Sequence, residues 1–192
     1  MPVRSVAVFC GSRPGRDPVW LHAAEALGTG LARAGIRLVF GGGRVGLMGA
    51  VADATLAAGG QVLGVIPEFL TTTEVAHAGL TELRVTTSMH SRKQMMFEES
   101  DAFVTMPGGL GTLDETVEIV TWRQLGLHAR PVLVCNVAGW ADGLLAALDQ
   151  AVADGFAAPI ARELFEVLPD VAGVLARLQS LPTAAPAASA RL

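Results

Sequence analysis

The sequence predicts an α/β fold in which a doubly wound parallel sheet lies between two layers of helices, within a single domain. Short apolar runs alternate with longer helical segments, as in a parallel sheet covered on both faces. Glycine-rich turns follow several of these runs. The 192 residues suffice for one full core, and 51% are hydrophobic against 17% charged, which excludes disorder for most of the chain.

Seven short apolar runs are expected to form strands. The first is rich in β-branched residues and stops at Gly11 and Ser12, and the third stops at Pro67. Residues 68–79 show no clear period and separate the third run from the fourth. In chain order, the expected strands are residues 3–10, 38–40, 61–66, 82–85, 102–106, 131–135 and 165–168.

Six segments are expected to form helices. The first has Pro18 in its first turn and Gly35 just after its end, and Ser88 is a suitable N-cap for the third. In the fourth, Thr112 and Glu115 have the spacing of a capping box. The expected helices are residues 18–34, 46–58, 89–100, 112–125, 140–153 and 170–179. Residues 1–180 show no domain boundary, and the Ala, Pro and Ser content of residues 181–192 predicts a disordered tail.

Charge and cysteine usage restrict the class of function. The net charge is −4 and no basic block occurs, which argues against a nucleic-acid partner. No apolar run is long enough to span a bilayer, and the N-terminus does not resemble a signal peptide. Cys10 and Cys135 each end an apolar run, as buried reduced thiols do. We therefore expect a cytoplasmic protein without a membrane partner. A nucleophilic Cys10 is the alternative, but no helper histidine can be placed beside it.

Three glycine-rich turns mark the expected ligand site. They span residues 10–12, 41–43 and 107–109, and each follows an expected strand. Ligands of open parallel sheets bind beyond the carboxyl ends of the strands. The turn that starts at Gly41 is less specific, because close packing of a helix on the sheet would also favour glycine there. We expect this turn to border the ligand.

The loop of residues 107–115 has the features of a phosphate cradle. Glycines let the backbone approach a ligand, and a helix that follows presents free N–H groups to an anion. The loop lacks the Gly-Lys-Ser/Thr ending of a Walker loop and does not lie in the first strand-to-helix turn, where a dinucleotide fingerprint is found. Glu115 has no basic residue three or four positions away, so a helical ion pair does not explain it.

Arg92 and Lys93 form a second candidate constellation. They interrupt the apolar stripe of Met89 and Met96 near a helix N-terminus, and neither has an acidic residue three or four positions away. Lys93 is also the only lysine in the chain. Such a pair suits a phosphate or carboxylate ligand. The alternative is that the aliphatic parts of both side chains pack against apolar residues while their charged groups reach water.

These motifs resemble those of the Lonely Guy (LOG) family, the cytokinin riboside 5′-monophosphate phosphoribohydrolases, long mislabelled as lysine decarboxylases. The family pattern PGGxGTxxE is complete at residues 107–115, and MHxRK is complete at residues 89–93. Residues 121–126 also resemble the family segment after the loop. The resemblance covers nearly all of residues 3–180.

The resemblance implies a Rossmann-like homodimer with a shared active site that hydrolyses the N-glycosidic bond of a nucleoside 5′-monophosphate. The products would be a free base, typically an N6-substituted adenine, and ribose 5-phosphate. Arg92 and Glu115 would carry catalysis. The residues implied to bind the nucleotide substrate are Glu74, Lys93, Gly108, Gly109, Leu110, Gly111, Thr112, Leu113, Asp114 and Thr121. We expect no cofactor and no metal, because the sequence has no cluster with metal-ligand spacing.

The residue types fit this chemistry. Cleavage of a ribosidic bond develops positive charge on the sugar, which the Glu115 carboxylate would stabilise. Alternatively, Glu115 would orient and deprotonate the attacking water. Arg92 would position the phosphate or polarise the leaving base. The alternatives are a general AMP nucleosidase, a non-catalytic carrier of a nucleotide or molybdenum cofactor, and a pyridoxal-phosphate decarboxylase that uses Lys93.

Overall fold

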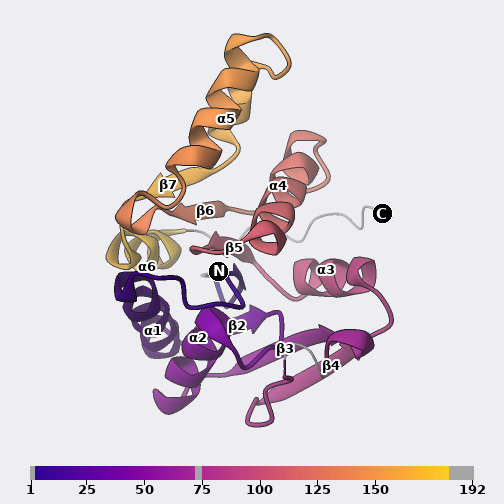
Figure 1. Ribbon diagram of the computed structural model, residues 1–192, viewed down its shortest axis with the longest axis vertical. Coiled ribbons are helices and arrows are strands. Elements are labelled where there is room, and N and C mark those ends of the chain that lie inside the picture. The colour runs from indigo at the N-terminus through magenta and orange to yellow at the C-terminus, as the bar shows by residue number, and fades with distance from the viewer. Residues whose placement is uncertain (1–2, 72–74, 182–192) are drawn as a thin grey trace.

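The protein folds around one parallel β-sheet (Figure 1). The computed structural model describes residues 3–71 and 75–181. Within these residues the sheet has seven strands in the order β4-β3-β2-β1-β5-β6-β7, and every neighbouring pair is parallel. The strands are β1 (Ser5–Phe9), β2 (Arg37–Phe40), β3 (Val62–Pro67), β4 (Glu82–Thr86), β5 (Ala102–Thr105), β6 (Val132–Cys135) and β7 (Glu166–Leu168).

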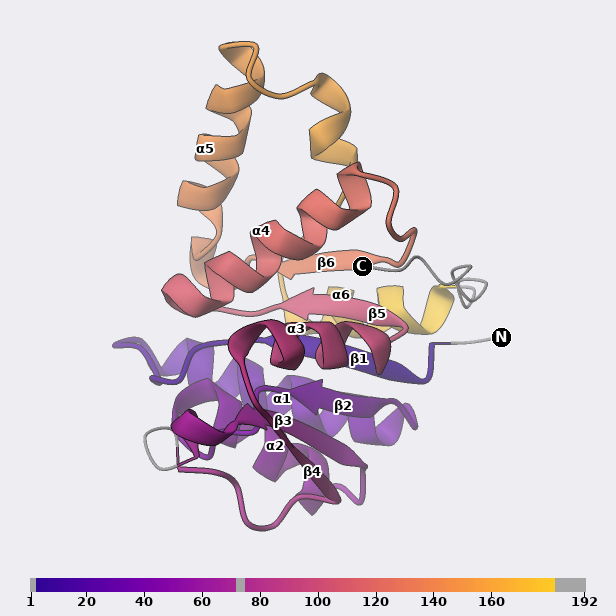
Figure 2. The ribbon, with the colours of Figure 1, turned by 90° about the vertical axis from the view of Figure 1, so that its right-hand side faces the viewer.

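Helices cover both faces of the sheet (Figure 2). In the described residues the α-helices are α1 (Pro18–Arg33), α2 (Gly46–Ala57), α3 (Met89–Glu98), α4 (Leu110–Gln124), α5 (Asp142–Ala153) and α6 (Val171–Ser180). Short 3-10 turns are η1 (Glu68–Leu70), η2 (Val137–Gly139) and η3 (Pro159–Glu163). None of the helices in these ranges is long and apolar enough to cross a membrane.

The core consists of two apolar layers, one on each face. Residues of α1, α2 and α6 pack on one face, where Leu27, Val51 and Val174 are buried. Residues of α3, α4 and α5 pack on the other, around Met96 and Ile119. The central strands β1, β2, β3, β5 and β6 are buried on both faces, which explains their nearly continuous apolar sequences.

The winding of the chain reverses at β1. From β1 the chain adds β2, β3 and β4 on one side, then crosses back to place β5, β6 and β7 on the other. The turns that follow β1 and β5 therefore lie side by side, and Gly11 N–H donates to Pro107 O at 3.0 Å. Such a reversal opens a crevice at the carboxyl ends of the two strands.

The predicted elements are all present, with shifted bounds. Ser88 caps α3 by accepting from Ser91 N–H, as predicted. Thr112 and Glu115 do not form the capping box that their spacing would allow, because α4 begins at Leu110 and its N-cap, Gly109, has no side-chain cap. The short turn η2 delays α5 until Asp142. Residues 182–192 of the predicted tail lie outside the described residues.

Candidate active site

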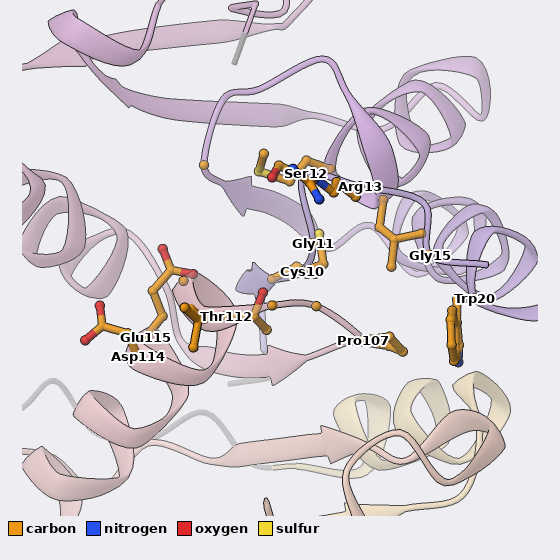
Figure 3. A pocket seen from close by; sticks show the side chains of 18 of the residues that line it. Cys10, Gly11, Ser12, Arg13, Gly15, Trp20, Pro107, Thr112, Asp114 and Glu115 are labelled. Carbon is orange, nitrogen blue, oxygen red and sulfur yellow. The ribbon is translucent and has the colours of Figure 1, made fainter. Parts of the chain in front are cut away.

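A cavity of about 740 Å³ lies at the carboxyl ends of the strands, where the winding reverses. All three predicted glycine turns contribute to its wall, through Gly11, Gly41 and the loop that starts at Pro107. Figure 3 shows Asp114 and Glu115 at one end of the cavity, Thr112 near its middle and Trp20 at the other end. Its volume is in the range of small-molecule sites.

The N-terminus of α4 is the best anion site on this cavity. The Asp17 carboxylate caps α1 by accepting from Val19 N–H at 2.9 Å. The first amides of α2, those of Leu47 and Met48, both donate to Gly11 O. In contrast, α4 starts at a glycine without a side-chain cap, and its first residues line the cavity. Its N–H groups and the positive end of its dipole therefore favour a phosphate there.

The cradle requires glycine at position 108. A Cβ at Gly108 would lie 2.0 Å from Thr112 Oγ1 and 2.9 Å from Gly11 N. Neither neighbour can withdraw easily, because Thr112 belongs to the first turn of α4 and the backbone of Gly11 is bonded to Pro107. The absence of a side chain at Gly108 therefore lets the β1 and β5 turns meet in front of α4.

Buried hydroxyl groups fix α4 on the sheet. Thr116 Oγ1 donates to Thr112 O at 2.6 Å, so it accepts from Thr105 Oγ1, which lies 2.9 Å away on β5. All three threonines are buried. Buried hydrogen bonds of this kind fix the position of α4 on β5, because breaking one would leave a polar group buried without a hydrogen-bond partner. Glu115 thus projects from a rigid turn.

Arg92 is held at the same cavity from α3. The residue is only 5% exposed, and Arg92 Nη2 donates to Gly41 O at 3.1 Å. A Cβ at position 41 would lie 1.9 Å from that nitrogen, so glycine is needed for this contact too. The guanidinium thereby brings a fixed positive charge to the cavity wall.

Glu115 and Arg92 both affect the pKa of the Cys10 thiol. Burial raises the pKa of the Cys10 thiol well above its usual range, the negative charge of Glu115 raises it further, and Arg92 lowers it. The thiol is therefore neutral at physiological pH, which does not suit a nucleophile. Cys10, Glu115 and Arg92 all line the cavity.

Lys93 pairs with carboxylates of α4. Lys93 Nζ lies 3.1 Å from Asp114 Oδ2 and 3.0 Å from Glu118 Oε2. Burial alone would lower the pKa of Lys93, but hydrogen bonds to Glu118 and Asp114 outweigh it and raise the pKa. Spacing along the sequence can indicate partners only on the helix that carries Lys93, whereas its actual partners lie on the neighbouring helix α4.

The structure brings most of the predicted site together. Among the described residues, the cavity wall includes Arg92, Gly108, Gly109, Leu110, Gly111, Thr112, Asp114 and Glu115. Lys93, Leu113 and Thr121 do not belong to that wall, and the Thr121 hydroxyl donates to Val117 O. Glu74 lies outside the described residues.

Several cavity residues were not predicted from the sequence, among them Arg13, Trp20 and Trp140. Trp140 follows η2, just beyond the carboxyl end of β6, so the rule that ligands bind beyond strand ends could have indicated it. Trp20 lies on α1 and carries no such signal. No group of three or more His, Cys, Asp or Glu side chains suited to a metal occurs in the described ranges.

The fold and the cavity define a class of protein: a Rossmann-like α/β protein with a cavity suited to an anionic ligand at its topological switch point. The family model described as "Possible lysine decarboxylase" matches residues 48–178. A cytokinin riboside 5′-monophosphate phosphoribohydrolase of Rhodococcoides fascians is 46% identical over 178 residues, or 92% of this chain and 90% of that protein. One of Arabidopsis thaliana is 42% identical over 92% of this chain and 81% of that protein. The chain belongs to this family, the Lonely Guy family.

Solved structures with low sequence identity share the fold. The molybdenum cofactor binding protein of Rippkaea orientalis has a TM-score of 0.71 at 21% identity, covering 94% of this chain and 98% of that one. A molybdenum cofactor carrier protein of Chlamydomonas reinhardtii has a TM-score of 0.69 at 22% identity, covering 91% and 95%. Together with the parallel sheet, these likenesses confirm the predicted fold class.

Proposed function

We propose that this protein hydrolyses the N-glycosidic bond of adenosine 5′-monophosphates, with N6-substituted adenines as the preferred bases, and releases the free base and ribose 5-phosphate. Family membership supports an enzyme that acts on the glycosidic bond of nucleotides. The observation that carries the proposal is the meeting of an anion-binding helix terminus, an arginine and a carboxylate at one cavity.

Glu115 is the proposed catalytic carboxylate. As the bond between C1′ and the base breaks, positive charge develops on the ribose, and a nearby carboxylate stabilises that charge. Water then adds to C1′ and loses a proton, which Glu115 is suited to accept. The rigid first turns of α4 support this role, because they hold the carboxylate at a fixed distance from a phosphate bound at the helix terminus.

The phosphate and Arg92 are proposed to orient the substrate. The amides of residues 109–112 would hold the 5′-phosphate, so that remote binding energy positions the bond that breaks. Arg92 cannot readily give up a proton, so it would bind the sugar phosphate or polarise the leaving base by a charge-assisted hydrogen bond. Lys93 and Glu74 are retained as proposed nucleotide-binding residues on the resemblance alone.

We also propose a homodimer with a shared active site. The outer side of α4 leaves Leu110 87% exposed, Leu125 67% and Val117 45%. The neighbouring helix α5 has the apolar sequence DGLLAALDQAVA, yet none of its residues is buried. Association of two subunits through the exposed sides of α4 and α5 would cover the apolar surfaces of both helices. It would also bring Thr121, which lies one turn from Val117, to a partner subunit, in agreement with a nucleotide-binding role there.

A decarboxylase that uses pyridoxal phosphate does not fit these residues. Such an enzyme needs a lysine that forms a Schiff base, and Lys93 is the only lysine in the chain. A nucleophilic lysine has a lowered pKa, whereas the pKa of Lys93 is raised by its two carboxylate partners. The description of the family model is therefore not the function proposed here.

The direct test is incubation of the purified protein with AMP, isopentenyladenosine 5′-monophosphate and the matching unphosphorylated ribosides, followed by chromatography of free base. Base release from the monophosphates alone is expected, because the phosphate supplies the orientation. The value of kcat/KM should be higher for the isopentenyl substrate; a higher value for AMP would indicate a general AMP nucleosidase. Binding without any base release would contradict the proposal and favour the carrier alternative.

A further inference from the structure

The peptide group between Gly108 and Gly109 lies at the start of the cradle, and its local sequence does not fix its orientation. Rotation of this group changes ψ of residue 108 and φ of residue 109, and both residues are glycines without a Cβ to oppose it. Around Gly109 there is also open space, since a Cβ there would meet nothing within 4 Å. A rotated group would present its carbonyl oxygen where an anion needs an N–H.

A tryptophan from another strand end holds this peptide group. Trp140 Nε1–H donates to Gly108 O at 3.2 Å, across 32 residues of sequence. In the described residues all peptide bonds are trans, so the carbonyl of one residue and the N–H of the next point in opposite directions. With Gly108 O bound to the indole, Gly109 N–H points away from Trp140. The preceding group is held in the same way, because Pro107 O accepts from Gly11 N–H.

We propose that Trp140 is a positioning residue that sets the Gly108–Gly109 peptide group so that Gly109 N–H is available to the substrate phosphate. This inference rests on the proposed use of the α4 N-terminus as the phosphate cradle. Trp140 acts through the backbone and does not contact the reacting atoms. Its effect should therefore appear in the affinity for phosphate-bearing ligands, whereas loss of simple packing would appear in stability alone.

The variant Trp140→Phe tests this, because it keeps an aromatic ring and removes the N–H. The matched control is Trp122→Phe, because Trp122 packs against Phe97 and lies outside the cavity wall. The dissociation constant of ribose 5-phosphate, measured by calorimetry on the full chain, should rise about tenfold in Trp140→Phe, as expected for a lost charge-assisted contact, and stay unchanged in Trp122→Phe. The value of KM for the nucleotide should rise in parallel, with a smaller change in kcat.

A third variant separates the hydrogen bond from the shape of the ring. Trp140→His keeps a ring N–H and should bind ribose 5-phosphate more tightly than Trp140→Phe. The inference is overturned if Trp140→Phe binds as wild type does, if both Phe variants weaken binding equally, or if the histidine gives no recovery. It is also overturned if the wild-type protein binds neither ribose 5-phosphate nor inorganic phosphate. Binding needs no turnover, so the result stands apart from whether base release is observed.

Discussion

Individual residues form this site through close approaches that only glycine permits. Gly108 lets Thr112 and Gly11 come together, and Gly41 makes room for the guanidinium of Arg92. In both places a polar group occupies the volume where a side chain would otherwise begin. The glycines therefore determine where the phosphate cradle and the arginine lie, although they carry no chemical group of their own.

The substitution Gly108→Ala tests this view. The added methyl would displace Thr112 or Gly11, so the affinity for ribose 5-phosphate should fall at least tenfold, and stability should fall by about 1–3 kcal/mol, as for overpacking. The control is Gly143→Ala on α5, where a Cβ meets nothing within 4 Å and a helical Ala should stabilise by about 0.5–1 kcal/mol. Calorimetry and thermal melts measure both quantities. Wild-type affinity in Gly108→Ala would contradict the steric account.

Sequence patterns indicated some of these residues and not others. Arg92 and Glu115 stood out because no oppositely charged residue lies three or four positions away from either in the sequence, and the glycine loop stood out by composition. Trp140 belongs to no motif, so only its place beyond the end of an expected strand could have indicated it. The partners of Lys93 were also hidden, since Asp114 and Glu118 lie on a different helix and only the packing of α3 beside α4 reveals them.

At the scale of elements, Lys93 joins α3 to α4. The side chain of Lys93 is 16% exposed and that of Glu118 is 25% exposed, so their pair is partly shielded from solvent. The raised pKa of Lys93 keeps its contribution to stability complete below about pH 10.4, the value expected in the unfolded chain, and the contribution is lost only as the pH rises through the higher folded value. At neutral pH the Lys93 ammonium is therefore fully charged.

A double-mutant cycle measures this link. Lys93→Met and Glu118→Gln should each lower the free energy of unfolding, and the double variant should lose less than the sum, with a coupling of about 0.5–1 kcal/mol. Urea titrations at pH 7 provide the values. Additive losses would show that Lys93 does not stabilise the fold through Glu118.

Local rules located the elements but not all of their bounds. Apolar runs that end at glycine or proline predicted the central strands, because strands buried on both faces of a parallel sheet have nearly continuous apolar sequences. The start of α4 was placed two residues late, since the spacing of Thr112 and Glu115 imitates a capping box while the chain already turns at Gly109. Tertiary contacts to Gly11 and Trp140 favour the earlier start, and a local rule does not include them.

At the scale of the whole molecule, the strand order brings distant turns to one place. Residues after β1, β2, β5 and β6 meet at the cavity because the winding reverses beside β1. No sequence pattern gives this order directly, but parallel pairing puts every carboxyl end at the same edge. This is why three glycine turns could be assigned to one site before their distances were known.

The exposed side of α4 gives a prediction about assembly. The protein should elute as a dimer in size-exclusion chromatography with light scattering, and Val117→Asp should yield a folded monomer, because Val117 is 45% exposed within a subunit. Val85→Asp, at an exposed position on β4, serves as the control and should remain a dimer. A monomeric wild type with full activity would contradict the shared site.

The most direct test of the central claim compares wild type, Glu115→Gln and Arg92→Ala with isopentenyladenosine 5′-monophosphate as substrate. The measurement is the joint appearance of free base and ribose 5-phosphate, with circular dichroism to check folding. Wild type should release the two products in equal amounts, and each variant should lose at least about a hundredfold in kcat/KM, the scale of one electrostatic catalytic group. Near-normal product release by either folded variant would contradict the catalytic role of that residue.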